Sequence, residues 1–192
     1  RIAETAIGRL SRAARDKIYL GYSDSGYFLA GLDRAGFPHL VHGPMPQDAM
    51  REGGEAAVAR ALSWLTGRAP DALEPGLADG PHAAFNITVF GLLLGTPLEP
   101  ALDGRILLLE EVAEHMYRID RALFHITANP VARRIAGLRL GRCSAIPPNE
   151  PEFGEDEESV ARHWCARAGI AWLGRADIGH DSANKVVPFG AF

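Results

Sequence analysis

His180 stands in a glycine-flanked stretch near the end of the chain, Gly179-His180-Asp181, with Asn184 shortly after it. Histidine is the side chain whose ordinary pKa lies closest to neutral pH, so it can take up and release a proton under mild conditions. Catalytic residues also collect on loops that a rigid scaffold positions. A histidine in a loop is common without such a role, so His180 by itself leaves a catalytic and a structural interpretation open.

Three carboxylates, Glu110, Glu111 and Glu114, follow an apolar run at residues 105–109 that predicts a buried strand. A carboxylate at the end of a buried strand is costly unless it is solvated, hydrogen-bonded or paired. One of the three could orient a histidine, as the third member of a catalytic triad does. The alternative is a solvated acidic edge. Adjacent strand residues point to opposite sides, so the sequence leaves open whether Glu110 or Glu111 would face a histidine.

Polar residues also follow two predicted strands in the first third of the chain. Ser23 and Asp24 come directly after a strand predicted at residues 17–20, and His42 ends the next one, at 39–42. Ligands of open α/β sheets bind at the carboxyl ends of strands, so these three residues are candidate substrate-binding residues. The alternatives are that Ser23 or Asp24 caps the following helix and that His42 is structural. No third ligand stands at a telling spacing and no phosphate-binding glycine loop is present, so no metal or cofactor site is predicted.

The elements that would position these residues alternate between strand and helix, which predicts an α/β fold. The first strand, a helix and the second strand form a parallel crossover. Pro, Gly and Asp are frequent at residues 68–82, as in a linker between domains. Helices are predicted at residues 2–14, 25–35, 56–65, after the capping residue Asn86 through 94, at 117–127 and from 155–158 onward; further strands are predicted at 105–109, 137–140, 171–173 and before 189.

Composition narrows the function classes. The chain of 192 residues has a net charge of −4 and a pI of about 6.0, without a basic block, so a nucleic-acid partner is not expected. No apolar run approaches the roughly 20 residues that a membrane span needs. Two cysteines, Cys143 and Cys165, argue against a disulfide framework and for a reducing compartment such as the cytoplasm.

Four stretches of the sequence together resemble the serine LD-carboxypeptidases, the family that includes muropeptide LD-carboxypeptidase and the microcin C immunity peptidase. They occur in the family's order and at compatible spacings over nearly the whole chain, and the third is the most specific. The stretches are KIYLGYSDSGYFLAGLDRAGFPHLVHGPM (17–45), NITVFGLLLGTP (86–97), GRILLLEEVAEHMYRIDRAL (104–123) and GHDSANKVVPFG (179–190).

The resemblance implies a two-domain fold. Residues 1–67 would be the C-terminal part of a Rossmann-like parallel-sheet domain, residues 68–84 a linker, and residues 85–192 a smaller swivelling β/α C-terminal domain. The linker agrees with the one that composition predicts at nearly the same place.

The resemblance also implies a Ser-Glu-His catalytic triad. Its glutamate is the first acidic residue after the strand, which matches Glu110, and its histidine is that of the Gly-His loop, which matches His180. The family's serine stands in a glycine-rich turn that, by spacing, falls at or just before Arg1. We therefore expect a companion N-terminal segment to carry the nucleophile, and a first helix without a capping residue at its start agrees with this expectation.

The implied activity is release of the terminal D-alanine from murein tetrapeptides in peptidoglycan recycling, through an acyl-enzyme and without a cofactor. Ser23, Asp24 and His42 would line the peptide-binding cleft, and the family often forms homodimers. Glu111 and Glu114 favour the cell-wall branch of the family. Two alternatives stay open: a self-immunity peptidase of the microcin C type, and a non-catalytic binding module of the same fold.

Overall fold

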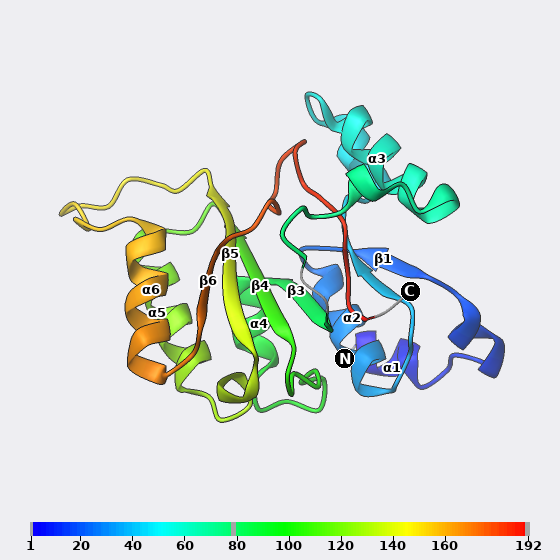
Figure 1. The fold of residues 1–192 in the computed structure, drawn as a ribbon, viewed down its shortest axis with the longest axis horizontal. Helices are drawn as coiled ribbons and strands as arrows, with labels where there is room; N and C mark the ends of the chain where they lie inside the picture. The colour runs from blue at the N-terminus through cyan, green and yellow to red at the C-terminus, as the bar shows by residue number, and fades with distance from the viewer. Residues whose placement is uncertain (1, 78–79, 191–192) are drawn as a thin grey trace.

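The computed structural model describes residues 2–77 and 80–190. Its strands form two sheets that lie side by side, with helices packed against each of them (Figure 1). Neighbouring strands along the chain pair in parallel in both sheets. The α/β class predicted from the sequence is thus confirmed.

The first sheet has three strands in the order β1-β2-β7. Helix α2 (Ser25–Arg34) joins the parallel strands β1 and β2, so the predicted strand–helix–strand crossover is present. The third strand comes from the far end of the chain and pairs antiparallel with β2. The C-terminal tail therefore returns to the first sheet. The strands are β1 Tyr19–Gly21, β2 Leu40–His42 and β7 Val187–Pro188.

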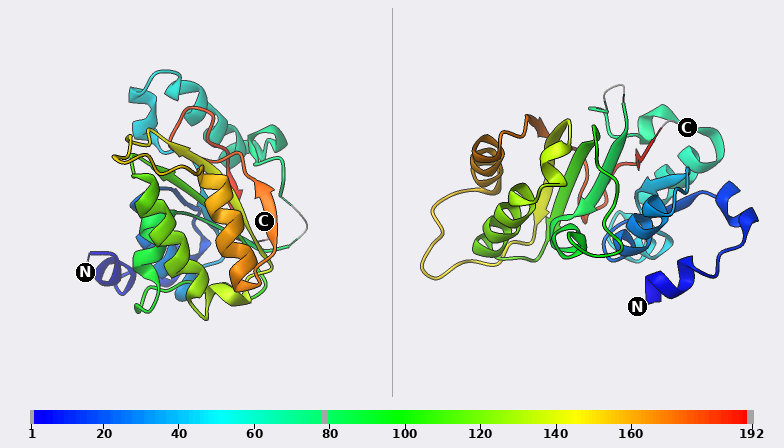
Figure 2. Two further views of the ribbon diagram at one scale, coloured as in Figure 1. Left: turned by 90° about the vertical axis from the view of Figure 1, so that its left-hand side faces the viewer. Right: turned by 90° about the horizontal axis from the view of Figure 1, so that it is seen from below.

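The second sheet has four parallel strands in the order β3-β4-β5-β6. Helix α4 packs against α5 and α5 against α6, so the three helices of this half lie next to one another (Figure 2). The strands are β3 His82–Asn86, β4 Ile106–Val112, β5 Gly137–Ser144 and β6 Trp172–Arg175. The helices are α4 Ile87–Leu93, α5 Met116–Ala128 and α6 Glu157–Ala168.

Strand β3 was not predicted, because its residues were assigned to the linker and to a helix cap. Ala83 and Ala84 have little intrinsic preference for strands, and a proline and a glycine precede them. Pairing with β4 and complete burial decide their conformation. The cap prediction itself is confirmed, since the Oδ1 atom of Asn86 accepts a hydrogen bond from the backbone N–H of Val89 at 3.1 Å.

The first helix is much shorter than predicted. Helix α1 spans Ile2–Ile7, and a separate 3₁₀ turn at Arg12–Asp16 follows it instead of a continuous helix. Gly8 stands where α1 ends, and glycine costs about 1 kcal/mol relative to alanine inside a helix. The remaining helix, α3 at Gly54–Gly67, is longer than predicted by two residues at each end.

The hydrophobic core is continuous between the two sheets. Leu32 and Leu40 from the first half belong to the same buried cluster as Phe85 and Leu108 from the second. Phe189, just beyond β7, packs edge to face on Phe85 at a centroid distance of 5.3 Å. This shared core fixes the position of the C-terminal tail relative to strands β3 and β4.

The predicted linker at residues 68–84 is anchored both to the C-terminal tail and to strand β5. Leu73 forms an isolated parallel bridge with Val186, and Glu74 forms an ion pair with Arg139 of β5 at 2.6 Å. Of this linker, residues 78–79 lie outside the described residues. The division of the chain into two domains at this point stays a prediction.

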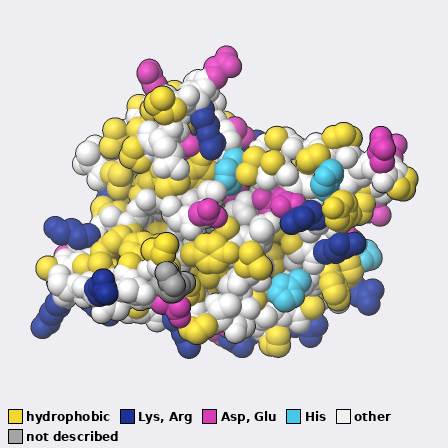
Figure 3. Space-filling view, turned by 180° about the vertical axis from the view of Figure 1, so that it is seen from behind, with side chains coloured by type: hydrophobic (Ala, Val, Ile, Leu, Met, Phe, Trp, Pro, Cys, Tyr) yellow, Lys and Arg dark blue, Asp and Glu magenta, His cyan; other side chains and the backbone are white. Residues whose placement is uncertain are grey.

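The face of the molecule seen from behind shows no dominant charge (Figure 3). On the face opposite to that of Figure 1, Lys and Arg side chains are dispersed among hydrophobic and acidic ones (Figure 3). Among the helices of the described residues, none is both long and apolar enough to cross a membrane.

Candidate active site

Glu110 lies near the carboxyl end of β4, inside the second sheet. Its main chain is in register with Asn86 of β3, and the pairing of β4 with β5 shifts register between Leu109 and Glu111, where Glu110 lies. Irregularities of this kind re-aim side chains and are frequent next to active sites. The side chain is fully buried, and this burial raises the pKa of the Glu110 carboxyl, while its contact with His180 opposes the rise.

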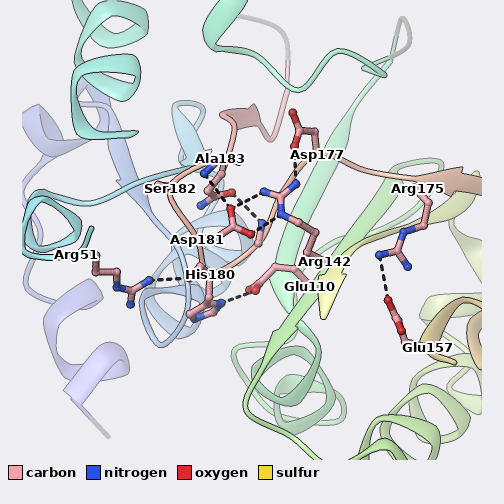
Figure 4. A network of polar contacts seen from close by, with 12 residues as sticks. Arg51, Glu110, Arg142, Glu157, Arg175, Asp177, His180, Asp181, Ser182 and Ala183 are labelled. Atoms are coloured by element: carbon pink, nitrogen blue, oxygen red, sulfur yellow. Dashed lines mark hydrogen bonds and ion pairs between the residues drawn. The ribbon is translucent and has the colours of Figure 1, made fainter. Parts of the chain in front are cut away.

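The ring of His180 points at this carboxylate from the loop that follows β6. The Nδ1 atom of His180 lies 2.5 Å from the Oε2 atom of Glu110, and the side chain of His180 is only 6% exposed (Figure 4). A histidine whose Nδ1–H donates to a carboxylate keeps its other nitrogen, Nε2, free to accept a proton. The pair can therefore act as a general base whose tautomer is fixed by a buried acid.

The first sheet and α3 hold the His180 loop from its other side. The ring of Tyr22, directly after β1, lies 4.8 Å from the His180 ring, centroid to centroid. The Nη1 atom of Arg51 donates to the backbone carbonyl of His180 at 2.9 Å, and Arg60 of α3 donates to the carbonyls of Ser182 and Asn184 at 3.1 and 2.8 Å. Both halves of the chain thus position this histidine.

Glu111 has a different environment and does not face His180. Its carboxylate accepts hydrogen bonds from the Asn86 side chain at 2.6 Å, from the Thr88 backbone and hydroxyl at 2.9 and 2.7 Å, and from the Val112 backbone at 2.9 Å. These donors include the first turn of α4, whose free N–H groups favour a negative charge. Of the two glutamates between which the sequence left the choice open, Glu110 is therefore the one that contacts His180.

The three predicted substrate-binding residues occupy different environments. Ser23 is half-buried with a positive φ of 54°, an uncommon conformation for a residue other than glycine, and Asp24 is exposed. Asp24 occupies the N-cap position of α2, yet its side chain makes no capping hydrogen bond. Among the described residues, no hydrogen bond or ion pair joins Ser23 or Asp24 to the Glu110–His180 pair.

His42 is buried, with 1% of its surface exposed. Its ring lies 5.8 Å from that of Tyr22, so it sits beneath the site and offers no open surface to a ligand. Burial lowers the pKa of His42 to about 4, with a smaller contribution in the same direction from His180 and an opposing one from Asn184. His42 therefore packs under Tyr22 in the interior and, contrary to the prediction, does not line an open cleft.

Several residues around the pair were not predicted from the sequence. Tyr22 and Arg51 contact His180 from the first half of the chain, and Arg142 of β5 contacts its loop from the second. Arg142 follows Gly141 at the carboxyl end of a strand next to β4, so the rule that ligands bind at this edge could have indicated it. Nothing in the local sequence indicates Arg51. Within residues 2–77 and 80–190, no three His, Cys, Asp or Glu side chains gather as metal ligands would.

Comparison with known proteins assigns the family. The model of the LD-carboxypeptidase C-terminal domain matches residues 79–192, more than half of the chain. The murein tetrapeptide carboxypeptidase of Pseudomonas aeruginosa is 28% identical over 201 residues, covering 95% of this chain and 64% of that protein. A Synechocystis sp. protein named as a carboxypeptidase is 31% identical over 187 residues, covering 93% of this chain and 60% of its own length. The chain thus spans less than two thirds of either relative.

Solved structures show the same fold. The muramoyltetrapeptide carboxypeptidase of Oxalobacter formigenes superimposes with a TM-score of 0.75 at 22% identity, over 99% of this chain and 66% of that one. The structure of MccF in complex with glutamyl sulfamoyl guanosine superimposes with a TM-score of 0.77 at 16% identity, over 96% of this chain and 67% of that one. With the family model matching its larger part, the chain belongs to the LD-carboxypeptidase family.

Proposed function

We propose that this chain is the Glu- and His-bearing part of a serine-type LD-carboxypeptidase. The enzyme releases the terminal D-alanine from murein tetrapeptides during peptidoglycan recycling in the cytoplasm. The observation that carries the proposal is the buried contact of 2.5 Å between His180 Nδ1 and Glu110 Oε2. The murein tetrapeptide specificity rests on the relative from Pseudomonas aeruginosa, which bears that name.

In the proposed mechanism, Glu110 holds the His180 ring with a proton on Nδ1 and stabilises the imidazolium that forms during the reaction. His180 Nε2 takes the proton of a serine hydroxyl as the serine oxygen attacks the scissile carbonyl. The same nitrogen then gives this proton to the leaving D-alanine amine, and an acyl-enzyme remains. A water molecule, deprotonated by His180, hydrolyses the ester and restores the serine.

The nucleophile in this proposal comes from a companion segment outside residues 1–192. This part of the proposal rests on the family resemblance, in which the serine precedes the stretch that begins at Lys17. Ser23 and Asp24 follow β1 at the carboxyl edge of the first sheet, and we assign them to the binding of the peptide. A homodimer is part of the proposal on family resemblance alone.

The test is hydrolysis of a murein tetrapeptide by the full-length protein that contains this chain, followed by mass spectrometry of the products. Loss of one alanine residue is expected, and His180→Ala should abolish it. His163→Ala is the matched control, because His163 lies exposed on α6. Intact-mass analysis of the same sample establishes which serine-bearing segment accompanies the chain.

The outcomes separate the alternatives. Cleavage of a peptide–nucleotide substrate without cleavage of the tetrapeptide would instead support a self-immunity peptidase. Binding of the tetrapeptide without any cleavage, in a sample that contains the complete protein, would support a non-catalytic module. Equal activity of the His180→Ala and wild-type proteins would contradict the assigned role of His180.

A further inference from the structure

Arg142 connects the His180 loop to strand β5. Its Nε and Nη2 atoms lie 2.5 and 2.9 Å from the two carboxylate oxygens of Asp181, and its Nη1 atom lies 2.5 Å from Oδ1 of Asp177 (Figure 4). Asp181 directly follows His180 in the sequence, so a two-point ion pair fixes the residue next to the ring. We call Arg142, Asp177 and Asp181 the arginine clamp.

The backbone around the arginine clamp is also in close contact. The N–H of Arg142 donates to the carbonyl of Ile178 at 2.8 Å. A Cβ atom at Gly179 would lie 3.1 Å from the Cβ of Arg142, so the loop approaches β5 at a distance that suits glycine. On the same strand, a Cβ at Gly141 would lie 2.7 Å from the carbonyl oxygen of Ile178 and 3.0 Å from the Cβ of Glu110. The loop therefore rests on β5 directly beside the carboxylate that His180 contacts.

The energetics favour orientation over stability as the role of the clamp. The side chains of Arg142, Asp177 and Asp181 are 30%, 37% and 34% exposed, and water screens ion pairs of this kind. The planar guanidinium still imposes a direction, because its fork matches the two oxygens of one carboxylate. Lysine offers the same charge as a single point and cannot impose this geometry.

We propose that Arg142 is a positioning residue that sets the direction of the His180 ring toward Glu110 by holding Asp181 and Asp177. The catalytic meaning of this role rests on the proposed function, whereas the geometric effect can be measured without it. The side chain of Arg142 bonds to Asp181 and Asp177 and not to the His180 ring or the Glu110 carboxylate, so it acts through the backbone of the loop.

The direct test is NMR of the His180 ring nitrogens in the ¹⁵N-labelled full-length protein that contains this chain. The wild-type ring should show the tautomer with a proton on Nδ1 and a downfield signal for that proton, as expected when it donates to a carboxylate. Arg142→Ala should lose the downfield signal and show a mixture of both tautomers. Arg142→Lys should give an intermediate spectrum. Arg175→Ala is the control, because it removes a half-buried ion pair with Glu157, at 3.2 Å, from the end of the next strand.

Asp181→Asn serves as a second variant that keeps the size of the side chain. This substitution weakens the two-point pair between Arg142 and residue 181 but leaves the ion pair between Arg142 and Asp177. A partial loss of the downfield signal is therefore expected. If Arg142→Ala does not fold, this variant decides. An unchanged His180 spectrum in folded Asp181→Asn and Arg142→Lys proteins overturns the positioning role, even if their melting temperatures fall.

Activity separates this inference from the proposed function. In the full-length protein, Arg142→Ala should lower kcat about tenfold or more with KM within about twofold, since small displacements of catalytic groups cost much rate. A wild-type protein that leaves the murein tetrapeptide intact would refute the proposed function and leave the NMR result standing. An active wild type whose Arg142 variants keep both spectrum and kcat would refute the positioning role alone.

Discussion

Glu110 and Glu111 are neighbours in strand β4, yet their carboxylates serve different parts of the molecule. Oε2 of Glu110 lies 2.5 Å from the ring of His180, whereas Glu111 accepts hydrogen bonds from Asn86 and Thr88 at the start of α4. Both side chains are buried. Alternation along the strand thus separates a candidate catalytic acid from a structural one by a single residue.

This separation predicts opposite effects for two substitutions. Glu110→Gln keeps the shape but removes the charge that orients His180, so kcat should fall by about 10³–10⁴, with little loss of stability. Glu111→Ala removes the acceptor of several buried or partly buried donors, so the free energy of unfolding should fall by about 3 kcal/mol. Urea denaturation and the tetrapeptide assay together measure both effects. Equal stability losses for the two variants would contradict the assignment.

Gly141→Ala should impair the site from within the neighbouring strand. The added methyl would lie 2.7 Å from the Ile178 carbonyl oxygen and must push the His180 loop away from β5. We expect kcat to fall by about a hundredfold and the free energy of unfolding to fall by about 1–3 kcal/mol.

Gly91→Ala is the control for this substitution. Gly91 lies within α4, where the nearest atom beyond the helix's own backbone would be Cγ1 of Ile126, 3.9 Å from an added Cβ, so alanine should raise stability slightly through its helix propensity. Its kcat should equal that of the wild type. A Gly141→Ala protein with unchanged kcat would show that the loop tolerates displacement.

His42 should make stability dependent on pH. Burial lowers its pKa in the folded protein to about 4, from the ordinary 6.5 of the unfolded chain. Between these values the unfolded chain binds a proton that the folded protein excludes, so the free energy of unfolding should decrease as pH falls from about 6.5 to about 4.

Comparison with His42→Gln isolates this contribution, because all other titrating groups are common to both proteins. Between pH 7 and pH 4, titration of His42 should lower the free energy of unfolding of the wild type by about 3 kcal/mol. The variant should not show this loss. Urea denaturation at a series of pH values measures the difference. Parallel pH profiles for the two proteins would mean that His42 titrates normally in the folded state.

The ion pair between Glu74 and Arg139 should stabilise the junction between the predicted linker and β5. Glu74 is 2% exposed and also accepts the backbone N–H groups of Gly76 and Asp177, at 2.8 and 3.1 Å. Arg139→Met would leave the carboxylate buried without its cation, at a cost of about 3–5 kcal/mol. The double variant Glu74→Gln/Arg139→Met should recover part of this loss in thermal denaturation, and a further loss of stability would contradict the pairing.

Local sequence patterns were sufficient where one signal dominated. The crossover at β1–α2–β2 and the cap at Asn86 follow from hydrophobic spacing and from a side chain suited to a helix start. The same patterns failed at β3 and α1. The alanines of β3 carry a weak strand signal, so only pairing with β4 makes them a strand, and the hydrophobic spacing beyond Ile7 continues through a glycine at which the helix ends.

The sequence by itself determined the family resemblance, the α/β class and His180 with an acidic partner at Glu110 or Glu111, because these depend on the order and spacing of short motifs along the chain. Only the tertiary structure decided that Glu110 and not Glu111 meets His180, that His42 is buried, and that Arg51 and Arg142 hold the histidine loop. These contacts join residues up to 129 positions apart. They depend on strand register and on the return of the C-terminal tail between the sheets, which no local pattern encodes.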